Sequence, residues 1–300
     1  MNILMAGGSG LLGAALKKSL LADGHTVFIL SRSNKPGSIQ WDGRGTAGWG
    51  HLVNEMDVAI HLAGRSTSAW PWTASRKKSF EDSRIIPGLA LGRAILEATH
   101  RPSLFVQVSG INHYGLRGGP ADESTPPGDD FLAQLTVKWE DSTKPVEGLG
   151  VRRIVLRTAV VLARESLILK LIALPVRMFF GGRIGSGRQA FPWIHVNDWV
   201  GGIRYLMANE SARGVYNMVA PSPTSLDDFT KTLADVIRRP YWFPVPAFLM
   251  RNVLGEMSVL ILEGRFSQPK RLIESGYVFQ FPGPREALND LFGELAKGEK

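Results

Sequence analysis

A glycine-rich loop near the N-terminus constrains the fold of this chain more than any other feature. The loop occupies residues 7–13, reads GGSGLLG, and follows a short apolar run from Ile3 to Ala6. Residues 11–22 then repeat leucine on one helical face and end at Asp23-Gly24, and residues 26–30 form a second apolar run of strand length. Strand, glycine loop, helix and strand in this order predict a βαβ unit that binds a dinucleotide.

The glycines serve a mechanical purpose in such a loop. They permit a tight turn and let the backbone approach a pyrophosphate, which then faces the amides at the start of the helix. An ordinary glycine turn is the alternative, but the strand before it and the amphipathic helix after it favour the dinucleotide loop. We therefore predict that the cofactor diphosphate is held by Gly7, Ser9, Gly10, Leu11, Leu12 and Gly13.

The end of the second predicted strand distinguishes NADP from NAD. An NAD site offers a carboxylate to the adenosine ribose about 20 residues beyond the loop, whereas this chain has Ser31-Arg32-Ser33 there. Arg32 can pair with a 2′-phosphate, and Ser31 can donate a hydrogen bond to it. We therefore predict NADP(H) as the cofactor, with a solvated arginine at a strand end as the alternative.

Short apolar runs alternate with helical segments through the first half of the chain. This alternation predicts an α/β Rossmann fold with a doubly wound parallel sheet. Pro87 should kink or divide the longest predicted helix, residues 75–98. Asp129 or Asp130 should cap the next helix, residues 131–144. Three further strands are predicted in residues 58–62, 104–108 and 154–156.

The composition of the sequence changes after Leu162, where a glycine-rich stretch that carries arginines follows. We predict that residues 1–162 form the NADP-binding Rossmann domain and that residues 191–220 return to it. Residues 163–300 should form a smaller, mainly helical domain on the substrate side.

Cap signals place the helices of this second half. Asn197 or Asp198 can cap a helix that begins at Trp199, and Ser225 has capping-box spacing before an apolar periodic run. Pro284 suits the first turn of a last helix, which should end near Ala296.

Composition narrows the class of protein. The 300 residues are 44% hydrophobic, include no cysteine, and carry a formal net charge of +8. The missing cysteines exclude a disulfide framework and thiolate chemistry, and the six histidines show no metal spacing. Scattered basic residues without an aromatic ladder favour a solvated surface over nucleic-acid binding. Since no apolar stretch is long enough to span a bilayer, we expect a cytoplasmic protein that takes a small-molecule substrate and binds neither nucleic acid nor membrane.

Several motifs together resemble the extended short-chain dehydrogenase/reductase superfamily, and within it the epimerase-family proteins that are nucleoside-diphosphate-sugar epimerase-like. The resemblance spans almost the whole chain. Its matching motifs are the glycine loop, residues 57–64 (DVAIHLAG), Ser83-Arg84, residues 131–140, Leu156-Arg157-Thr158, residues 185–189 (GSGRQ) and residues 192–195 (PWIH).

The resemblance implies further cofactor contacts. Leu62, Ala63 and Gly64 look like the turn that lines the adenosine side and central ribose of the cofactor. Arg84 and Arg157 are expected to approach the cofactor as well. The alternative for Leu62, Ala63 and Gly64 is a plain strand end. The alternative for the two arginines is that they are surface or ion-paired residues.

The resemblance also places the glycine-rich stretch between the cofactor and the C-terminal domain. Glycine-exposed amides with guanidinium groups suit an anionic substrate, so we expect Arg183, Arg188 and Trp193 to contact it. A flexible loop with solvated arginines is the alternative. His195 and Asp198 are expected to be architectural rather than catalytic.

The catalytic pattern of the superfamily is incomplete in this chain. Its members carry Tyr-x-x-x-Lys, in which the tyrosine exchanges a proton and the lysine lowers the tyrosine pKa. With Glu140 as the anchor, these two positions hold Leu132 and Thr136. Gly110 holds the usual serine position at the end of the fifth strand, and Ser109 lies one residue earlier.

Three alternatives for the chemistry stay open. Ser109 is shifted into use by its loop, or Tyr114 or His113 supplies the proton, or no hydride transfer occurs. The corresponding functions are an NADPH-dependent oxidoreductase or epimerase and a catalytically quiet NADPH-binding regulator. Nucleic-acid binding through the basic surface is the least favoured function.

Overall fold

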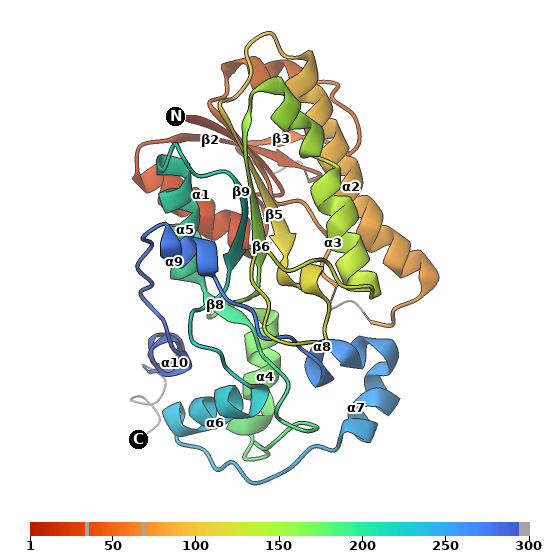
Figure 1. Cartoon of the computed structure of the whole chain (residues 1–300), viewed down its shortest axis with the longest axis vertical. Coiled ribbons are helices and arrows are strands. Elements are labelled where there is room, and N and C mark those ends of the chain that lie inside the picture. Colours follow the sequence, from red (N-terminus) through yellow and green to blue (C-terminus); the bar gives the residue numbers. More distant parts are fainter. Residues whose placement is uncertain (34–35, 68–69, 294–300) are drawn as a thin grey trace.

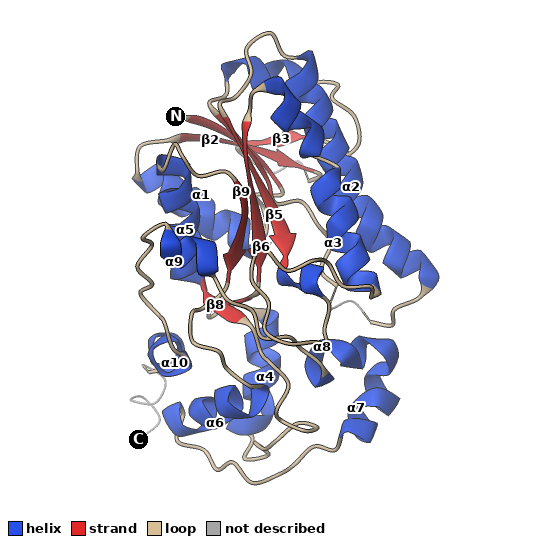
Figure 2. Ribbon diagram, viewed as in Figure 1, coloured by secondary structure: helices blue, strands red, loops and turns tan. Residues whose placement is uncertain are grey.

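A seven-stranded parallel sheet forms the centre of the N-terminal part, with the strand order β3-β2-β1-β4-β5-β6-β9 (Figure 1). The computed structural model describes residues 1–33, 36–67 and 70–293. Helices cover both faces of the sheet (Figure 2), and the predicted α/β Rossmann fold is confirmed. The strands are β1 (Asn2–Ala6), β2 (Thr26–Ser31), β3 (Ser38–Gln40), β4 (Val58–His61), β5 (Leu104–Gly110), β6 (Arg152–Thr158) and β9 (Gly214–Met218), while β7 (Val160–Leu162) and β8 (Trp193–His195) pair separately.

Alternate residues of β1 enter different hydrophobic cores. Ile3 and Met5 pack into the core that also contains Leu16 and Leu20 of α1 (Leu11–Ala22), whereas Leu4 enters the core on the other face. Successive side chains of a strand point to opposite faces, so a strand that is apolar throughout must be covered twice. The strand order reverses between β1 and β4, which opens a crevice at the carboxyl ends of these strands.

Two helices, α2 (Ala74–Glu97) and α3 (Phe131–Asp141), cover the face opposite α1 (Figure 1). Of the predicted kink or division at Pro87, the division does not occur, because one helix runs through this residue. Pro87 is buried there, so tertiary packing holds the turn that the proline weakens. Asp130 caps α3 as predicted, and its side chain accepts a hydrogen bond from the Ala133 amide at 3.0 Å.

The helix α5 (Val196–Ala208) is capped differently from the prediction. Neither Asn197 nor Asp198 is the cap; the imidazole of His195 accepts the Asn197 N–H at 3.2 Å. The chain enters α5 directly from β8, so the helix starts earlier than its periodicity indicates. The buried Asp198 carboxylate instead accepts the backbone N–H groups of Gln280 and Phe281, at 2.7 and 2.9 Å, and ties the C-terminal segment to the sheet domain.

The C-terminal region is mainly helical and has its own core. Ser225 caps the helix α6 as predicted, and Pro284 opens α10, whose predicted extension beyond residue 293 lies outside the described residues. In the described part of the chain, no helix combines the length and apolar character that crossing a membrane requires. The remaining helices are α4 (Leu167–Arg177), α6 (Leu226–Val236), α7 (Ala247–Leu254), α8 (Val259–Leu262), α9 (Lys270–Glu274) and α10 (Pro284–Phe292), with short 3-10 turns η1 (Gly50–Glu55), η2 (Ile111–Tyr114), η3 (Lys144–Leu149) and η4 (Gly255–Ser258).

Candidate functional site

A cleft of about 870 Å³ lies over the carboxyl ends of β1, β2 and β4. The loops that follow these three strands form its walls, because parallel strands deliver their following loops to the same edge of a sheet. Eight of the predicted cofactor residues line the cleft: Gly7, Ser9, Gly10, Ser31, Arg32, Leu62, Ala63 and Gly64.

The glycine loop is shaped to hold an anion at the start of α1. Gly7 has a φ of +84°, and a Cβ there would lie 2.6 Å from the backbone nitrogen of Ala63. The backbone of β1 therefore approaches the turn after β4 as closely as only glycine allows. Within the described residues, no side chain caps α1 at Gly10, so the first amides of the helix remain available to a phosphate.

Three of the predicted loop residues do not line the cleft. Leu12 packs against the core, Leu11 presents its side chain to solvent, and a Cβ on Gly13 would lie 2.5 Å from the Cα of Gly8. Gly13 thus permits close packing of the helix against the loop. Contact of Leu11 and Leu12 with a cofactor would run through their backbone N–H groups rather than their side chains.

Two arginines line the part of the cleft beyond β2. Arg32 follows β2, and Arg44 lies in the loop after β3; both line the cleft. The Asp42 carboxylate accepts the backbone N–H groups of Arg44 and Gly45, at 2.8 and 3.2 Å, and these hydrogen bonds lower the pKa of Asp42. Sequence reasoning missed Arg44, because its place in the cleft depends on the pairing of β3 with β2; its position between two glycines is the only local signal.

The turn after β4 supplies a further cation that sequence reasoning missed. Arg65 lines the cleft directly after the predicted residues, and its guanidinium donates a hydrogen bond to the Ser79 hydroxyl at 3.0 Å. The His61 Nδ1 accepts the Ala63 N–H at 3.3 Å, and burial lowers the pKa of His61 to about 4. A neutral imidazole therefore braces the turn from inside the sheet.

Arg84 does not line the cleft, and its side chain packs against the turn after β4. A Cβ on Gly64 would lie 3.3 Å from the Arg84 side chain, and the Arg84 guanidinium stacks over the Trp139 ring at 5.0 Å. Burial lowers the pKa of Arg84 to about 10, which leaves the guanidinium charged at neutral pH. Its approach to a cofactor stays a prediction.

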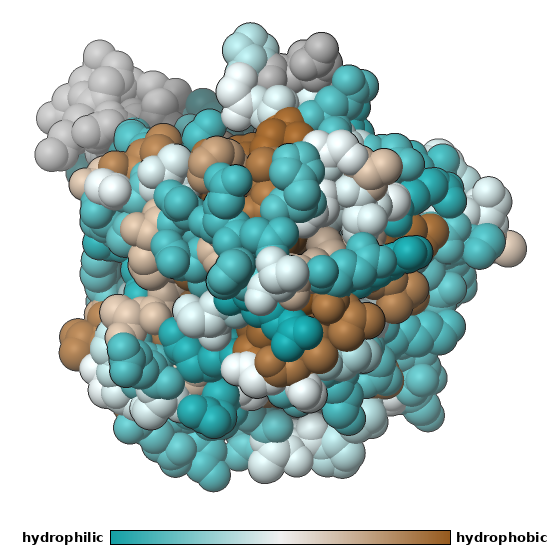
Figure 3. All heavy atoms as spheres, turned by 90° about the horizontal axis from the view of Figure 1, so that it is seen from above, coloured by the Kyte–Doolittle hydropathy of each residue, from teal (hydrophilic) through white to brown (hydrophobic). Residues whose placement is uncertain are grey.

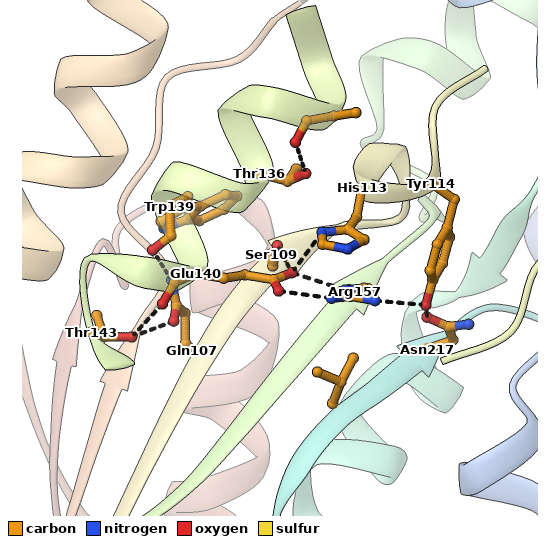
Figure 4. A network of polar contacts seen from close by, with 12 residues as sticks. Gln107, Ser109, His113, Tyr114, Thr136, Trp139, Glu140, Thr143, Arg157 and Asn217 are labelled. Carbon is orange, nitrogen blue, oxygen red and sulfur yellow. Dashed lines mark hydrogen bonds and ion pairs between the residues drawn. The ribbon is translucent and has the colours of Figure 1, made fainter. Parts of the chain in front are cut away.

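Glu140 lies at the centre of a buried polar network that contains the predicted catalytic residues (Figure 4). Its two carboxylate oxygens accept hydrogen bonds from the Arg157 guanidinium, each at 2.9 Å, and one also accepts from the Ser109 hydroxyl at 2.8 Å. Burial alone would raise the pKa of Glu140, but the hydrogen bonds and charge of Arg157 outweigh it and hold that pKa below its usual value. The carboxylate is therefore charged at neutral pH.

Arg157 extends this network to Tyr114. The guanidinium donates to the Tyr114 hydroxyl at 3.0 Å, and this hydroxyl donates to the side-chain oxygen of Asn217 at 2.7 Å. Tyr114 is 1% exposed, and burial raises its pKa to about 12. A hydroxyl used as both acceptor and donor is placed to hold structure rather than to exchange protons. Arg157 is likewise engaged here and does not line the 870 Å³ cleft.

His113 also lies near the Glu140 carboxylate but forms no hydrogen bond with it. Its Nδ1 is 3.7 Å from Glu140 Oε1, which is too long for a hydrogen bond, and has no other hydrogen-bond partner among the described residues. Burial lowers the pKa of His113 to about 4, so the imidazole is neutral at pH 7. Of Ser109, Tyr114 and His113, the last therefore keeps the greatest freedom to exchange a proton.

A second cleft, of about 380 Å³, lies between the loop after β5, the start of α3 and the C-terminal helices. Leu132, which holds the position of the superfamily tyrosine, lines it. Arg117 and Glu263 are joined by two hydrogen bonds of 2.9 and 2.8 Å at its wall. Charged and polar residues from both parts of the chain surround it: Asp129, Asp130, Arg117, Glu256, Glu263 and Arg265.

The residues predicted to contact substrate lie away from both described clefts. Trp193 is 1% exposed, belongs to the C-terminal core, and donates its indole N–H to the Thr224 hydroxyl at 3.3 Å. Arg183 and Arg188 are exposed on the turn that follows α4. Because an anchored core tryptophan has no face left for a ligand, only the two arginines stay predictions for substrate contact.

Comparison with known proteins confirms the resemblance seen in the sequence. A family model described as the NAD dependent epimerase/dehydratase family matches residues 3–218, and one described as a domain of unknown function (DUF1731) matches residues 245–291. The chain is 36% identical to the epimerase family protein YfhF of Bacillus subtilis (strain 168), over 98% of this chain and 99% of that protein.

Solved structures agree with this relationship. The human epimerase family protein SDR39U1, solved with NADPH, superposes with a TM-score of 0.91 at 33% identity, over 99% of this chain and 100% of that one. A UDP-glucuronic acid 4-epimerase from Bacillus cereus, solved with UDP-glucuronic acid and NAD, has a TM-score of 0.78 at 17% identity, over 98% of this chain and 100% of that one. The second likeness concerns the fold alone.

Proposed function

The chain belongs to the NAD dependent epimerase/dehydratase family, and we propose that it binds NADPH and uses it to reduce or epimerise a polar small molecule. The observation that carries this proposal is the cleft over the glycine loop, which ends at Arg32 and Arg44. The human relative named above was solved with NADPH. When bound, the cofactor supplies hydride from its nicotinamide ring.

The residues present fit this dinucleotide. The loop has space for a diphosphate at Gly10, which lines the cleft and has nothing within 4 Å of its Cβ position. The uncapped start of α1 offers amides to the charge of that diphosphate. Arg32 and Arg44 place two guanidinium groups at the adenosine end, where the 2′-phosphate distinguishes NADP from NAD.

This arrangement predicts a loss of cofactor selectivity when the arginines are removed. Arg32→Ala and Arg44→Ala should each weaken NADPH binding by about tenfold, because a charge-assisted contact contributes about 1.5–3 kcal/mol when desolvated and less at an exposed site. NADH binding should change little. Calorimetric titration of both nucleotides measures the effect, with Arg93→Ala on the outer face of α2 as the control. Equal weakening of NADPH and NADH would contradict the assignment.

We place the substrate in the second cleft, beside the start of α3. Its lining mixes guanidinium and carboxylate groups, which favours a polar ligand over an apolar one. His113 is the proposed proton-exchanging residue; it does not line this cleft itself, but the next residue, Tyr114, does. Glu140 is the positioning partner of His113 and is held in place by Arg157. Apo distances of this kind often shorten when substrate binds.

Turnover measurements test the proposed chemistry. NADPH oxidation should appear with at least one member of a carbonyl and nucleotide-sugar panel, and His113→Ala should lower kcat by about 100-fold or more without weakening NADPH binding. Tyr114→Phe should have a smaller effect on kcat, since its hydroxyl serves Arg157 and Asn217. Full activity of the His113 variant would exclude it as the proton-exchanging residue.

A catalytically quiet NADPH-binding regulator is the second candidate. Leu132 and Thr136 occupy the positions of the superfamily tyrosine and lysine, and both are buried. Such a protein would keep the cofactor cleft and lose the proton relay. NADPH binding that responds to the arginine substitutions, without turnover across the panel, would favour this function over hydride transfer.

A further inference from the structure

The helix α4 is apolar on two opposite faces. Leu169, Ala173 and Val176 are buried against the C-terminal core. On the other face a second apolar stripe, spaced by four, three and four residues, leaves each side chain more than half exposed: Leu167, Leu171, Leu174 and Met178. A surface helix normally presents polar residues to water, so this stripe indicates a contact with a further apolar phase or partner.

Aromatic side chains continue the stripe beyond the end of α4. Phe179 and Phe180 are 53% and 55% exposed, and Trp242 and Phe243, from the segment between α6 and α7, are 71% and 53% exposed. The two segments lie side by side, since the Trp242 indole donates to the Phe179 carbonyl at 2.8 Å and the rings of Phe180 and Phe243 are 5.8 Å apart.

The helix α7 follows the segment of Trp242 and Phe243, and it has no fully buried residue. Phe248, Leu249 and Val253 are 59%, 45% and 66% exposed. We call the exposed stripe of α4, the four aromatic residues and these three residues of α7 the apolar face. It belongs to the end of the molecule drawn lowest in Figure 1. Figure 3 shows the opposite end, where hydrophilic residues cover most of the surface.

The two segments that supply the apolar face carry cations and no acid. Residues 167–183 and 238–254 supply all of its side chains and contain no aspartate or glutamate. The nearest acids in the sequence lie just outside these segments: Glu165 is exposed before Leu167, and Glu256 is paired with Lys77 at 2.6 Å. Exposed basic residues flank the apolar ones: Lys170, Arg177, Arg183, Arg238 and Arg251.

We propose that the apolar face docks on an anionic lipid surface. Exposed leucine, phenylalanine and tryptophan side chains enter the interface between headgroups and acyl chains, and the flanking cations face the phosphates. Each Lys or Arg near such a surface contributes by attraction to its negative potential. Lying on a membrane requires no spanning helix. The proposal therefore departs from the expectation from the sequence that the chain binds no membrane, which was based on spanning segments alone.

The same charges disfavour a second copy of this chain as the occupant. Pairing two apolar faces would bring Lys170 and Arg177 of each copy toward the corresponding cations of the other, with no carboxylate from either face between them. Juxtaposed like charges cost several kcal/mol at an interface. An anionic bilayer covers the apolar side chains and neutralises the cations together.

Vesicle sedimentation with the full chain tests the proposal. We expect binding to vesicles of phosphatidylcholine with about 30% phosphatidylglycerol to be at least tenfold tighter than to phosphatidylcholine alone, and about 0.5 M salt to weaken it. Phe180→Asp combined with Trp242→Asp should reduce the binding to the anionic vesicles by about tenfold or more. Lys170→Glu combined with Arg177→Glu should do the same.

A matched control separates this face from general surface apolarity. Leu89 and Leu96 of α2 are 54% and 57% exposed, so Leu89→Asp combined with Leu96→Asp should leave vesicle binding unchanged. All variants should retain NADPH affinity, which shows that they fold. The proposal is overturned by equal binding to neutral vesicles or by equal losses in the α2 control. It is also overturned if sedimentation velocity shows a dimer that the Phe180 and Trp242 substitutions dissociate, without vesicle binding.

Discussion

Replacing Glu140 by alanine is expected to lower the free energy of unfolding by about 3–5 kcal/mol, because it leaves the Arg157 guanidinium buried without a counter-charge. The Arg157 side chain is 7% exposed and forms two hydrogen bonds with this carboxylate. The substitution also removes the acceptor of the Ser109 hydroxyl and the carboxylate beside His113. Urea unfolding at neutral pH measures the change.

An exposed ion pair of the same kind provides the control. Arg93 and Glu97 pair at 2.7 Å on the surface of α2, with side chains 71% and 50% exposed. Glu97→Ala should cost less than about 0.5 kcal/mol, since solvent screens such pairs. Equal losses for Glu97→Ala and Glu140→Ala would contradict the view that the buried network stabilises the sheet domain.

The pH dependence of the Glu140 effect has a definite sign. The folded protein holds the pKa of Glu140 below its usual value, so its contribution is complete above about pH 4.3, the ordinary pKa of glutamate. It is lost as the pH falls through the lower folded pKa. The stability difference between the parent protein and Glu140→Ala should therefore narrow only in acid. A difference that narrows between pH 8 and 6 would point to another group.

Gly7→Ala is expected to weaken NADPH binding by about 100-fold or more and to destabilise the protein. Two causes act together: the residue has a φ of +84°, and the new Cβ would lie 2.6–2.7 Å from backbone atoms of Leu62 and Ala63. Backbone cannot move aside as a flexible side chain can, so the loop and the turn after β4 must separate. Calorimetry with NADPH and urea unfolding of the free protein measure both effects.

Gly24→Ala isolates one of these causes. Gly24 has a similar φ of +78°, but nothing lies within 4 Å of its Cβ position. Its substitution should carry only the backbone penalty, about 1–2 kcal/mol, and leave NADPH affinity unchanged. If Gly7→Ala behaved like Gly24→Ala in both measurements, close approach of the loop to the β4 turn would not be what the cofactor requires.

Features that depend on neighbours in the chain were readable from the sequence. The helix after the glycine loop has the predicted bounds, Leu11–Ala22, because its apolar period and its glycine stops are local. The caps at Asp130 and Ser225 were likewise predictable, since a cap bonds to an amide three residues ahead. The cap of α5 was not, because the path of β8 into the helix decides it.

The same limit applies to site residues whose partners lie far away in the sequence. Arg32 was found because it follows a recognisable strand, whereas Arg44 joins it through the placement of β3 beside β2. Arg157 is still predicted to approach the cofactor, but its partner Glu140 lies 17 residues earlier in the sequence and could not be named from a strand-end pattern. A sequence pattern states which residue ends a strand, but not which of several partners its side chain will meet.

The sequence by itself determined the Rossmann architecture, the dinucleotide loop and the absence of the superfamily proton relay, because these follow from periodicity, glycine spacing and residue identity over short stretches. Only the tertiary structure decided which polar residues share the Glu140 network and which face of α4 is covered. Both depend on contacts between segments far apart in the chain. An apolar helical period predicts that a face will be buried, but the elements available to cover it are known only once the chain has folded.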